Sequence, residues 1–220
     1  MATQFGNNNS GNIALDAISY GSTSNFGNFV TPSVSSTLAR TQYLSATQAV
    51  LGNGTAIRAA VADNGATQTL TTAITQPNYA RNLTVLPSGT AGNVTAVTVI
   101  INGTDMQNQP ISESFLLTAG ALTQTVGKRA FKTVTSIVQP AVGSGVSLAY
   151  GTGNVIGMAG YLYGNTVLFA FLAGVKETTA PTVTTSTTSL SNNTFTLNSS
   201  LNGTPIYISY ELAVDQSLVG

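Results

Sequence analysis

The sequence predicts an all-β protein, an antiparallel β-sandwich or barrel-like domain with an extended N-terminal arm. Short runs rich in Thr and Val, which suit pleated and half-buried strands, recur along the chain. Clusters of Gly, Asn and Asp separate these runs, as in sandwiches and barrels. Apolar residues make up 42% of the 220 positions and the formal net charge is zero. The chain therefore lacks the low hydrophobicity and high net charge of disordered proteins.

The first 30 residues are rich in Asn, Ser and Gly and carry one charged side chain, Asp16. Three aromatic residues, Phe5, Phe26 and Phe29, are spaced through this segment. Composition alone favours a flexible tail. The aromatic residues favour instead an extended arm that docks on a neighbouring protein, and we predict such an arm.

A weak helical pattern follows the arm. Apolar residues between Pro32 and Leu51 recur at approximately helical spacing, although Ser and Thr are poor interior helix formers. The first predicted unit is therefore residues 1–53, an N-terminal extended arm with a short helix.

The second predicted unit is a β-sandwich core over residues 54–178. Two runs at 56–62 and 67–74 are separated by a turn cluster of the kind that joins antiparallel strands. Further runs follow at 82–86, 94–103 and 111–118. The run AFKTVTSIV at 130–138 is partly apolar on both faces, which predicts a central strand.

The third predicted unit, residues 179–220, consists of C-terminal strands. NTFTLNS at 193–199 and IYISYELAV at 206–214 alternate cleanly, and Asn202-Gly203 between them is a hairpin turn signal. These strands are expected either to complete the β-domain or to form a small appended subdomain.

Residues 155–175, VIGMAGYLYGNTVLFAFLAGV, are long and apolar enough to cross a bilayer. However, Gly164-Asn165 interrupts the stretch and its flanks lack the anchoring residues of a membrane span. We predict two β-length runs and no membrane partner. The second run, residues 166–175, is expected to be a strand buried on both faces in the centre of the sandwich.

Few residues are available for chemistry. The chain has no His and no Cys, and no spacing selects a pair among its seven acidic residues. The glycines at 151–157 precede no predicted helix, so they are interpreted as turn glycines and not as a phosphate-binding loop. We predict no catalytic, metal-binding or cofactor-binding residue, no cofactor and no enzymatic activity.

One basic cluster, Lys128, Arg129 and Lys132, precedes and enters the run at 130–138. Together with Phe5, Phe26 and Phe29 it forms the set of candidate protein-interface residues. The alternative is a solvated strand edge that discourages aggregation. No other basic residues extend the cluster, so no nucleic-acid partner is expected.

The surface is expected to lie against other protein. Charged residues make up 6% of the chain, against about 25% in typical soluble domains. A chain with so few charges lacks the coat that keeps a free monomer soluble. Its start has no basic region followed by an apolar region, so no secretory signal is expected.

Five segments occur in an order that resembles tailed-bacteriophage virion proteins, β-sandwich components of the capsid surface or tail. They are QPNYARNLTVLPSG, VTVIINGTDMQNQPISESFLLT, GKRAFKTVTSIVQPA, GVSLAYGTGNVIGM and NTVLFAFLAGVKETTAPTVT. The resemblance covers residues 74–212 and is strongest in Gly-x-x-Ala-Phe-Lys-Thr-Val at 127–134. It implies packing surfaces and not an active site.

The resemblance implies a non-enzymatic structural protein of the virion. The first expectation is a capsid decoration or cement protein, made in the host cytoplasm, that binds the major capsid protein on the outer capsid surface and stabilises the shell. A homo-oligomer is expected, since trimers are common in the family implied. The alternatives are a tail, neck or fibre component and, more distantly, a secreted adhesin or surface-layer β-module.

Overall fold

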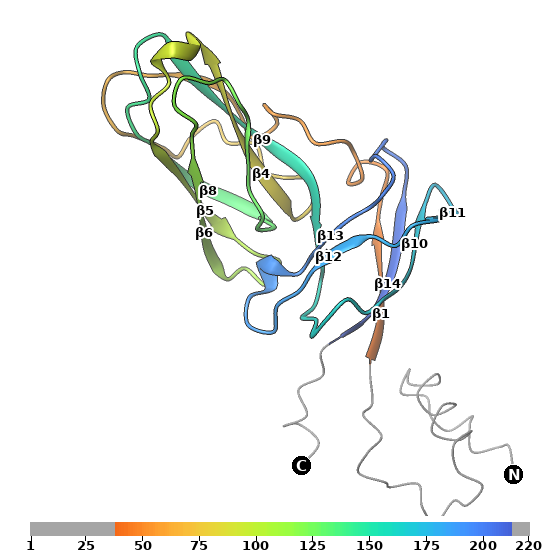
Figure 1. Cartoon of the computed structure of the whole chain (residues 1–220). Coiled ribbons are helices and arrows are strands. Elements are labelled where there is room, and N and C mark those ends of the chain that lie inside the picture. Colours follow the sequence, from red (N-terminus) through yellow and green to blue (C-terminus); the bar gives the residue numbers. More distant parts are fainter. Residues whose placement is uncertain (1–37, 213–220) are drawn as a thin grey trace, which may run out of the picture.

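The computed structural model describes residues 38–212, and this part of the chain is built from antiparallel β-strands (Figure 1). Two 3-10 turns, η3 (Ala91–Asn93) and η4 (Leu190–Asn192), interrupt the strands. The predicted all-β antiparallel class is confirmed.

The strands form three sheets, which we name after a long strand in each. The β5 sheet contains, in spatial order, β3 (Gln68–Leu70), β8 (Thr133–Gln139), β5 (Thr98–Thr104) and β6 (Pro110–Leu116). The β9 sheet contains β12 (Thr182–Thr184), β13 (Thr194–Thr196), β9 (Val146–Gly157), β4 (Arg81–Gly89) and β7 (Thr125–Val126), and β2 (Arg58–Ala62) also pairs with β9. The β14 sheet contains β1 (Leu38–Leu44), β14 (Ile206–Leu212), β10 (Val167–Leu172) and β11 (Val175–Lys176).

The β5 and β9 sheets form a sandwich around a first apolar core. Leu83 and Leu148 from the β9 sheet are buried in one cluster with Ile101, Phe115 and Ile137 from the β5 sheet. Along β5 the inward positions are buried and the intervening positions more exposed, as expected for a sheet with one face toward solvent. β8 lies between β3 and β5, so the prediction of a central strand at 130–138 is confirmed.

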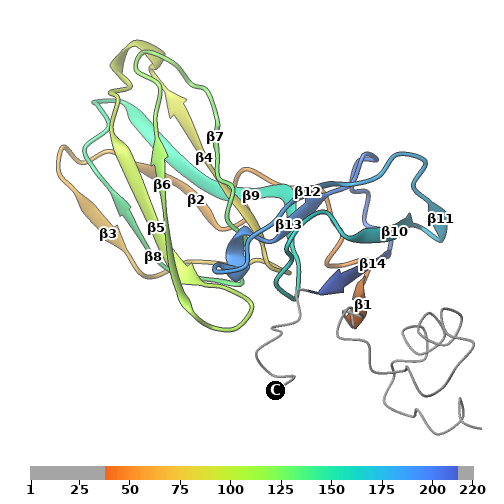
Figure 2. The ribbon, with the colours of Figure 1, turned by 60° about the horizontal axis from the view of Figure 1, so that its bottom comes forward.

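A second core lies under the β14 sheet. Ile206, Ile208 and Tyr210 of β14 are buried in one cluster with Ile156 of β9 and Phe195 of β13. Figure 2 shows the β14 sheet beside one end of the sandwich, with β9, β12 and β13 between the two. The 12-residue strand β9 therefore contributes side chains to both cores.

The predicted short helix between Pro32 and Leu51 is wrong for the part that the structure describes. Residues 38–44 form β1, which pairs with β14 along its whole length, from Leu38 opposite Leu212 to Leu44 opposite Ile206. Gln42 and Leu44, two positions apart, are both buried on the side of the second core. Burial along this segment therefore repeats every second residue, as in a strand, and not with the helical spacing that was expected. Residues 38–53 consequently belong to the folded body and not to an arm.

The apolar stretch at 155–175 is divided between strands as predicted, but only residues 155–157 of its first run are strand and residues 158–166 form a loop. β9 ends at Gly157 and β10 begins at Val167. The prediction that the second run is buried on both faces is wrong, because Leu168 is 53% and Phe169 39% exposed. Only one face of β10 meets the second core. Within residues 38–212, no helix is long and apolar enough to cross a membrane.

Two expected strand connections are also wrong. β13 and β14, which flank Asn202-Gly203, do not pair with each other: β13 pairs with β9 and β12, and β14 with β1 and β10. β2 and β3 likewise belong to different sheets. In the C-terminal region, β12 and β13 thus extend the β9 sheet and pack against the second core, while β14 belongs to the β14 sheet.

Candidate binding surfaces

The basic cluster is organised around a carboxylate of β6. The backbone N–H of Lys128 donates to Glu113 Oε1 at 2.6 Å, and the N–H of Arg129 donates to the same oxygen at 3.3 Å. Burial raises the pKa of Glu113, while these two hydrogen bonds and the charges of Arg129 and Lys128 act in the opposite direction. The carboxylate therefore fixes the loop between β7 and β8.

Two side chains of the cluster also have intramolecular hydrogen-bond partners. Arg129 donates from Nη1 to the Ser112 carbonyl at 3.1 Å, and Lys132 donates from Nζ to Asn108 Oδ1 at 2.9 Å. Lys128 and Lys132 remain exposed. The structure thus gives the cluster a role in joining β6 to the loop before β8, and its role as a protein interface stays a prediction.

Packing explains the glycine and the apolar residues of the motif at 127–134. A Cβ at Gly127 would lie 2.6 Å from Glu113 Oε2 and 2.8 Å from the ring of Phe115, so a larger residue fits there only if these side chains move. Ala130 and Phe131 are buried. The backbone of Phe131 forms a bridge with Arg81 at the start of β4. The motif is therefore a packed turn into β8.

The predicted interface residues Phe5, Phe26 and Phe29 lie outside the described residues, and their role stays a prediction.

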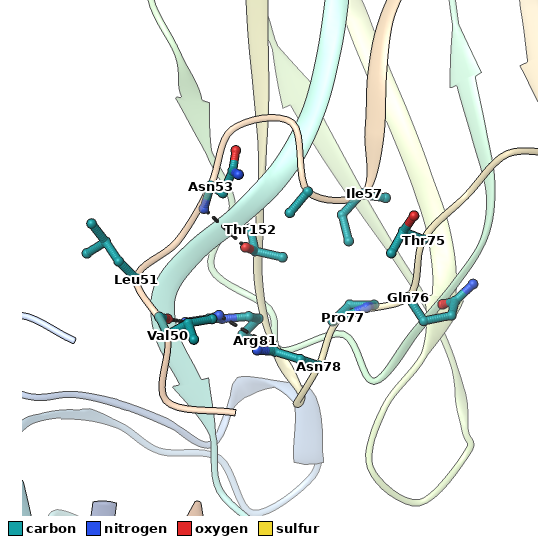
Figure 3. Close-up of a pocket in the computed structure, with 11 residues that line it drawn as sticks. Val50, Leu51, Asn53, Ile57, Thr75, Gln76, Pro77, Asn78, Arg81 and Thr152 are labelled. Atoms are coloured by element: carbon teal, nitrogen blue, oxygen red, sulfur yellow. Dashed lines mark hydrogen bonds between the residues drawn. The ribbon is translucent and has the colours of Figure 1, made fainter. Parts of the chain in front are cut away.

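A pocket of about 390 Å³ lies between the segment after β1, the segment before β4, and β9 (Figure 3). Its apolar lining is Val50, Leu51, Ala56, Ile57 and Pro77. Its polar lining is Asn53, Thr75, Gln76, Asn78, Arg81 and Thr152. Asn53 is held to β9 by its backbone N–H, which donates to Thr152 Oγ1 at 3.3 Å.

Arg81, the first residue of β4, is the charged residue of this pocket and is 1% exposed. Its guanidinium donates from Nη2 to the Val50 carbonyl at 2.9 Å and from Nη1 to Asn78 Oδ1 at 3.3 Å. Burial lowers the pKa of Arg81 to about 10, so the group remains protonated at neutral pH. Arg81 is not among the site residues predicted from the sequence. The sequence feature that marks Arg81 is a lone Arg directly before the predicted strand at 82–86. In the structure the four residues after Arg81 are all buried.

The outer face of the β14 sheet carries an aromatic surface, which we define as Tyr43, Tyr207, Phe169 and Phe171. Tyr43, Tyr207 and Phe171 are aligned across three neighbouring strands. The rings of Tyr43 and Tyr207 are 4.8 Å apart, and those of Phe169 and Phe171 meet edge to face at 5.6 Å.

This aromatic surface is accessible and is bordered at one edge by the exposed Lys176, which lies opposite Phe171. Tyr43 is 50% and Tyr207 43% exposed. Thr41 and Ser209, which lie opposite each other in the next outward row, are uncharged. Exposed apolar clusters of this kind mark surfaces that contact other molecules. The sequence showed the aromatic residues, but not that three strands distant in the chain bring them to one face.

Neither a family model, nor a curated protein, nor a solved structure matches this chain. Among the described residues, no group of three or more acidic side chains could hold a metal ion.

Proposed function

We propose that this protein is a non-enzymatic structural component of a tailed-bacteriophage virion, and specifically a capsid decoration protein that binds the major capsid protein and stabilises the shell. The observation that carries the proposal is the exposed aromatic surface of the β14 sheet in a chain with 6% charged residues. The segment resemblance over residues 74–212 supports the virion class.

The energetics of the aromatic surface fit a protein contact. Interfaces are enriched in Tyr and Phe and depleted in charge at their centre. Truncating a central aromatic anchor typically costs 2 kcal/mol or more of binding free energy. Tyr43 and Tyr207 already contact each other with their rings tilted, so part of the side-chain ordering that binding requires is present in the free protein.

Binding to virion parts tests the proposal. The purified chain should bind expanded capsid shells of a phage whose genome carries this sequence, prepared without the protein, and should raise the temperature at which those shells open. Binding to tail tubes and not to shells would favour the tail component instead. Binding to neither would overturn the proposal.

A variant pair tests the surface itself. Tyr207→Ser combined with Phe169→Ser should weaken attachment by about 30-fold or more, which corresponds to 2 kcal/mol. The control is Leu116→Ser combined with Val126→Ser, since these apolar side chains are even more exposed but lie on the sandwich. Equal attachment by both variants would exclude the aromatic surface as the binding site.

A further inference from the structure

Arg81 has a buried charge without a counter-ion in the described part of the chain. Its guanidinium has five N–H donors, and the two hydrogen bonds to Val50 and Asn78 use two of them. Nε is fully buried and has no hydrogen-bond partner. Leaving a charged group buried and unpaired costs free energy. An anion that pairs with Arg81 removes this cost, which favours its binding.

The carboxylates among residues 38–212 are engaged elsewhere or are not partners of Arg81. Asp63 accepts from the N–H groups of residues 142 and 143, and Asp105 from those of 107 and 109. Glu113 holds the loop before β8, and Glu177 accepts from the Ser199 N–H. The fifth, Glu211, lies on β14, away from the pocket lining.

The pocket beside Arg81 suits an acid with a short apolar part. Figure 3 shows the guanidinium at one end of the pocket, between Val50 and Asn78. The volume of about 390 Å³ lies within the roughly 300–1,000 Å³ typical of small-ligand sites. Leu51, Ile57 and Pro77 offer apolar contact. A carboxylate has two acceptor oxygens that match adjacent N–H groups of a guanidinium.

We propose that this pocket binds a carboxylate at Arg81, carried by an acidic side chain of a bound protein or by a free small acid. The carboxylate accepts from the N–H bonds that Nη1 and Nη2 leave unused, and the carbon atoms next to it lie against the apolar lining. The proposal is independent of the virion assignment.

The Nε–H resonances of arginine in the full, nitrogen-15-labelled chain provide the direct test. The chain has four arginines, Arg40, Arg58, Arg81 and Arg129, so Arg81→Lys assigns the Arg81 resonance by its disappearance. Sodium acetate and a glutamate blocked at both backbone ends serve as probes, with sodium chloride at equal ionic strength as the reference. Arg58 is the internal control, because its Nε is also buried and unpartnered but it does not line the pocket.

The expected result is a saturable shift of the Arg81 resonance with a carboxylate, while the Arg58 resonance does not saturate. Tighter binding of blocked glutamate than of acetate would identify a protein side chain as the source. Equal or tighter binding of acetate would identify a small free acid. Ala56→Leu, which enlarges a lining residue without altering Arg81, should raise the dissociation constant at least tenfold and keep the resonance.

Three results would overturn the proposal. One is the absence of saturation with both carboxylates. Another is an equal response to chloride. The third is a shifted Arg81 resonance in ligand-free Asp16→Asn or Asp215→Asn protein, since the chain would then supply its own counter-ion.

Discussion

The hydroxyl of Tyr210 donates a 2.8 Å hydrogen bond to Oε1 of Gln42, and both side chains are buried. The same Oε1 accepts from the Ala159 N–H at 3.0 Å, and Gln42 Nε2 donates to the Gly157 carbonyl at 2.9 Å. This network joins the first and last described strands to the end of β9. It connects the β14 sheet to the sandwich through polar contacts that only one register of β1 satisfies.

Removing the Tyr210 hydroxyl should therefore lower stability. Tyr210→Phe is expected to cost about 1 kcal/mol in the free energy of unfolding, since Gln42 Oε1 loses a buried donor. Denaturant unfolding followed by circular dichroism measures this. The matched control, Tyr43→Phe on the exposed face of β1, should be within about 0.5 kcal/mol of the unaltered chain. Equal stability of the two variants would contradict the role of the network.

Gly127 should not tolerate a methyl group. Gly127→Ala is expected to destabilise the fold by roughly 1–3 kcal/mol, because its Cβ would overlap Glu113 and the ring of Phe115. A Cβ at Gly92 would meet no heavy atom within 4 Å, so Gly92→Ala is the control. The free energy of unfolding of both variants decides the point. A Gly127→Ala protein as stable as Gly92→Ala would mean that the loop relaxes without cost.

Glu113 should give stability a measurable pH dependence. Burial raises its pKa above the ordinary value of 4.5, so the folded state holds the proton more tightly than the unfolded state does. This contribution is complete below pH 4.5 and is lost as the pH rises through the folded-state pKa. Glu113→Gln removes the titrating group.

The measurement is the free energy of unfolding of both proteins between acid and neutral pH. Relative to Glu113→Gln, the unaltered chain should lose stability as the pH rises. If the free energy of unfolding changed equally with pH in both proteins, burial would not be raising the pKa of Glu113.

The buried tyrosines Tyr150 and Tyr210, and the partly buried Tyr79, should resist ionisation in the folded state. Burial, followed by the effect of Tyr210, raises the pKa of Tyr79 from 10.0 to about 12, and burial also raises the pKa values of Tyr150 and Tyr210. Because the folded state favours the neutral phenol, this contribution to stability is complete below pH 10 and is lost as the pH rises toward 12.

An alkaline titration followed by phenolate absorbance tests this expectation. Some tyrosines should ionise near their ordinary pKa and the buried ones only at higher pH or on unfolding. Tyr79→Phe should reduce the absorbance change that occurs above pH 10. It should also lessen the loss of stability between pH 10 and 12. A single ionisation step near pH 10 in the folded protein would contradict the assigned burial.

The sequence by itself determined the fold class and the main breaks between strands. The runs at 94–103 and 130–138 are predicted as strands because they are rich in Thr and Val and are bounded by turn residues, and they contain most of β5 and β8. The Gly164-Asn165 turn signal separated the ends of β9 and β10. The low content of charged residues, 6%, predicts a surface for protein contact, which stays a prediction.

The tertiary structure decided which strands are partners and which faces are covered. Gln42 and Tyr210 are 168 positions apart, and β1 has the same alternation whether its partner is β14 or another strand. β10 is apolar on both sides, yet one side faces outward because only one core lies against it. The setting of Arg81 likewise depends on residues 50 and 78, which the chain path and not the local pattern brings together. Local sequence sets the period of a strand, whereas packing between distant segments selects its neighbours, so the aromatic surface and the Arg81 pocket became visible only in the folded chain.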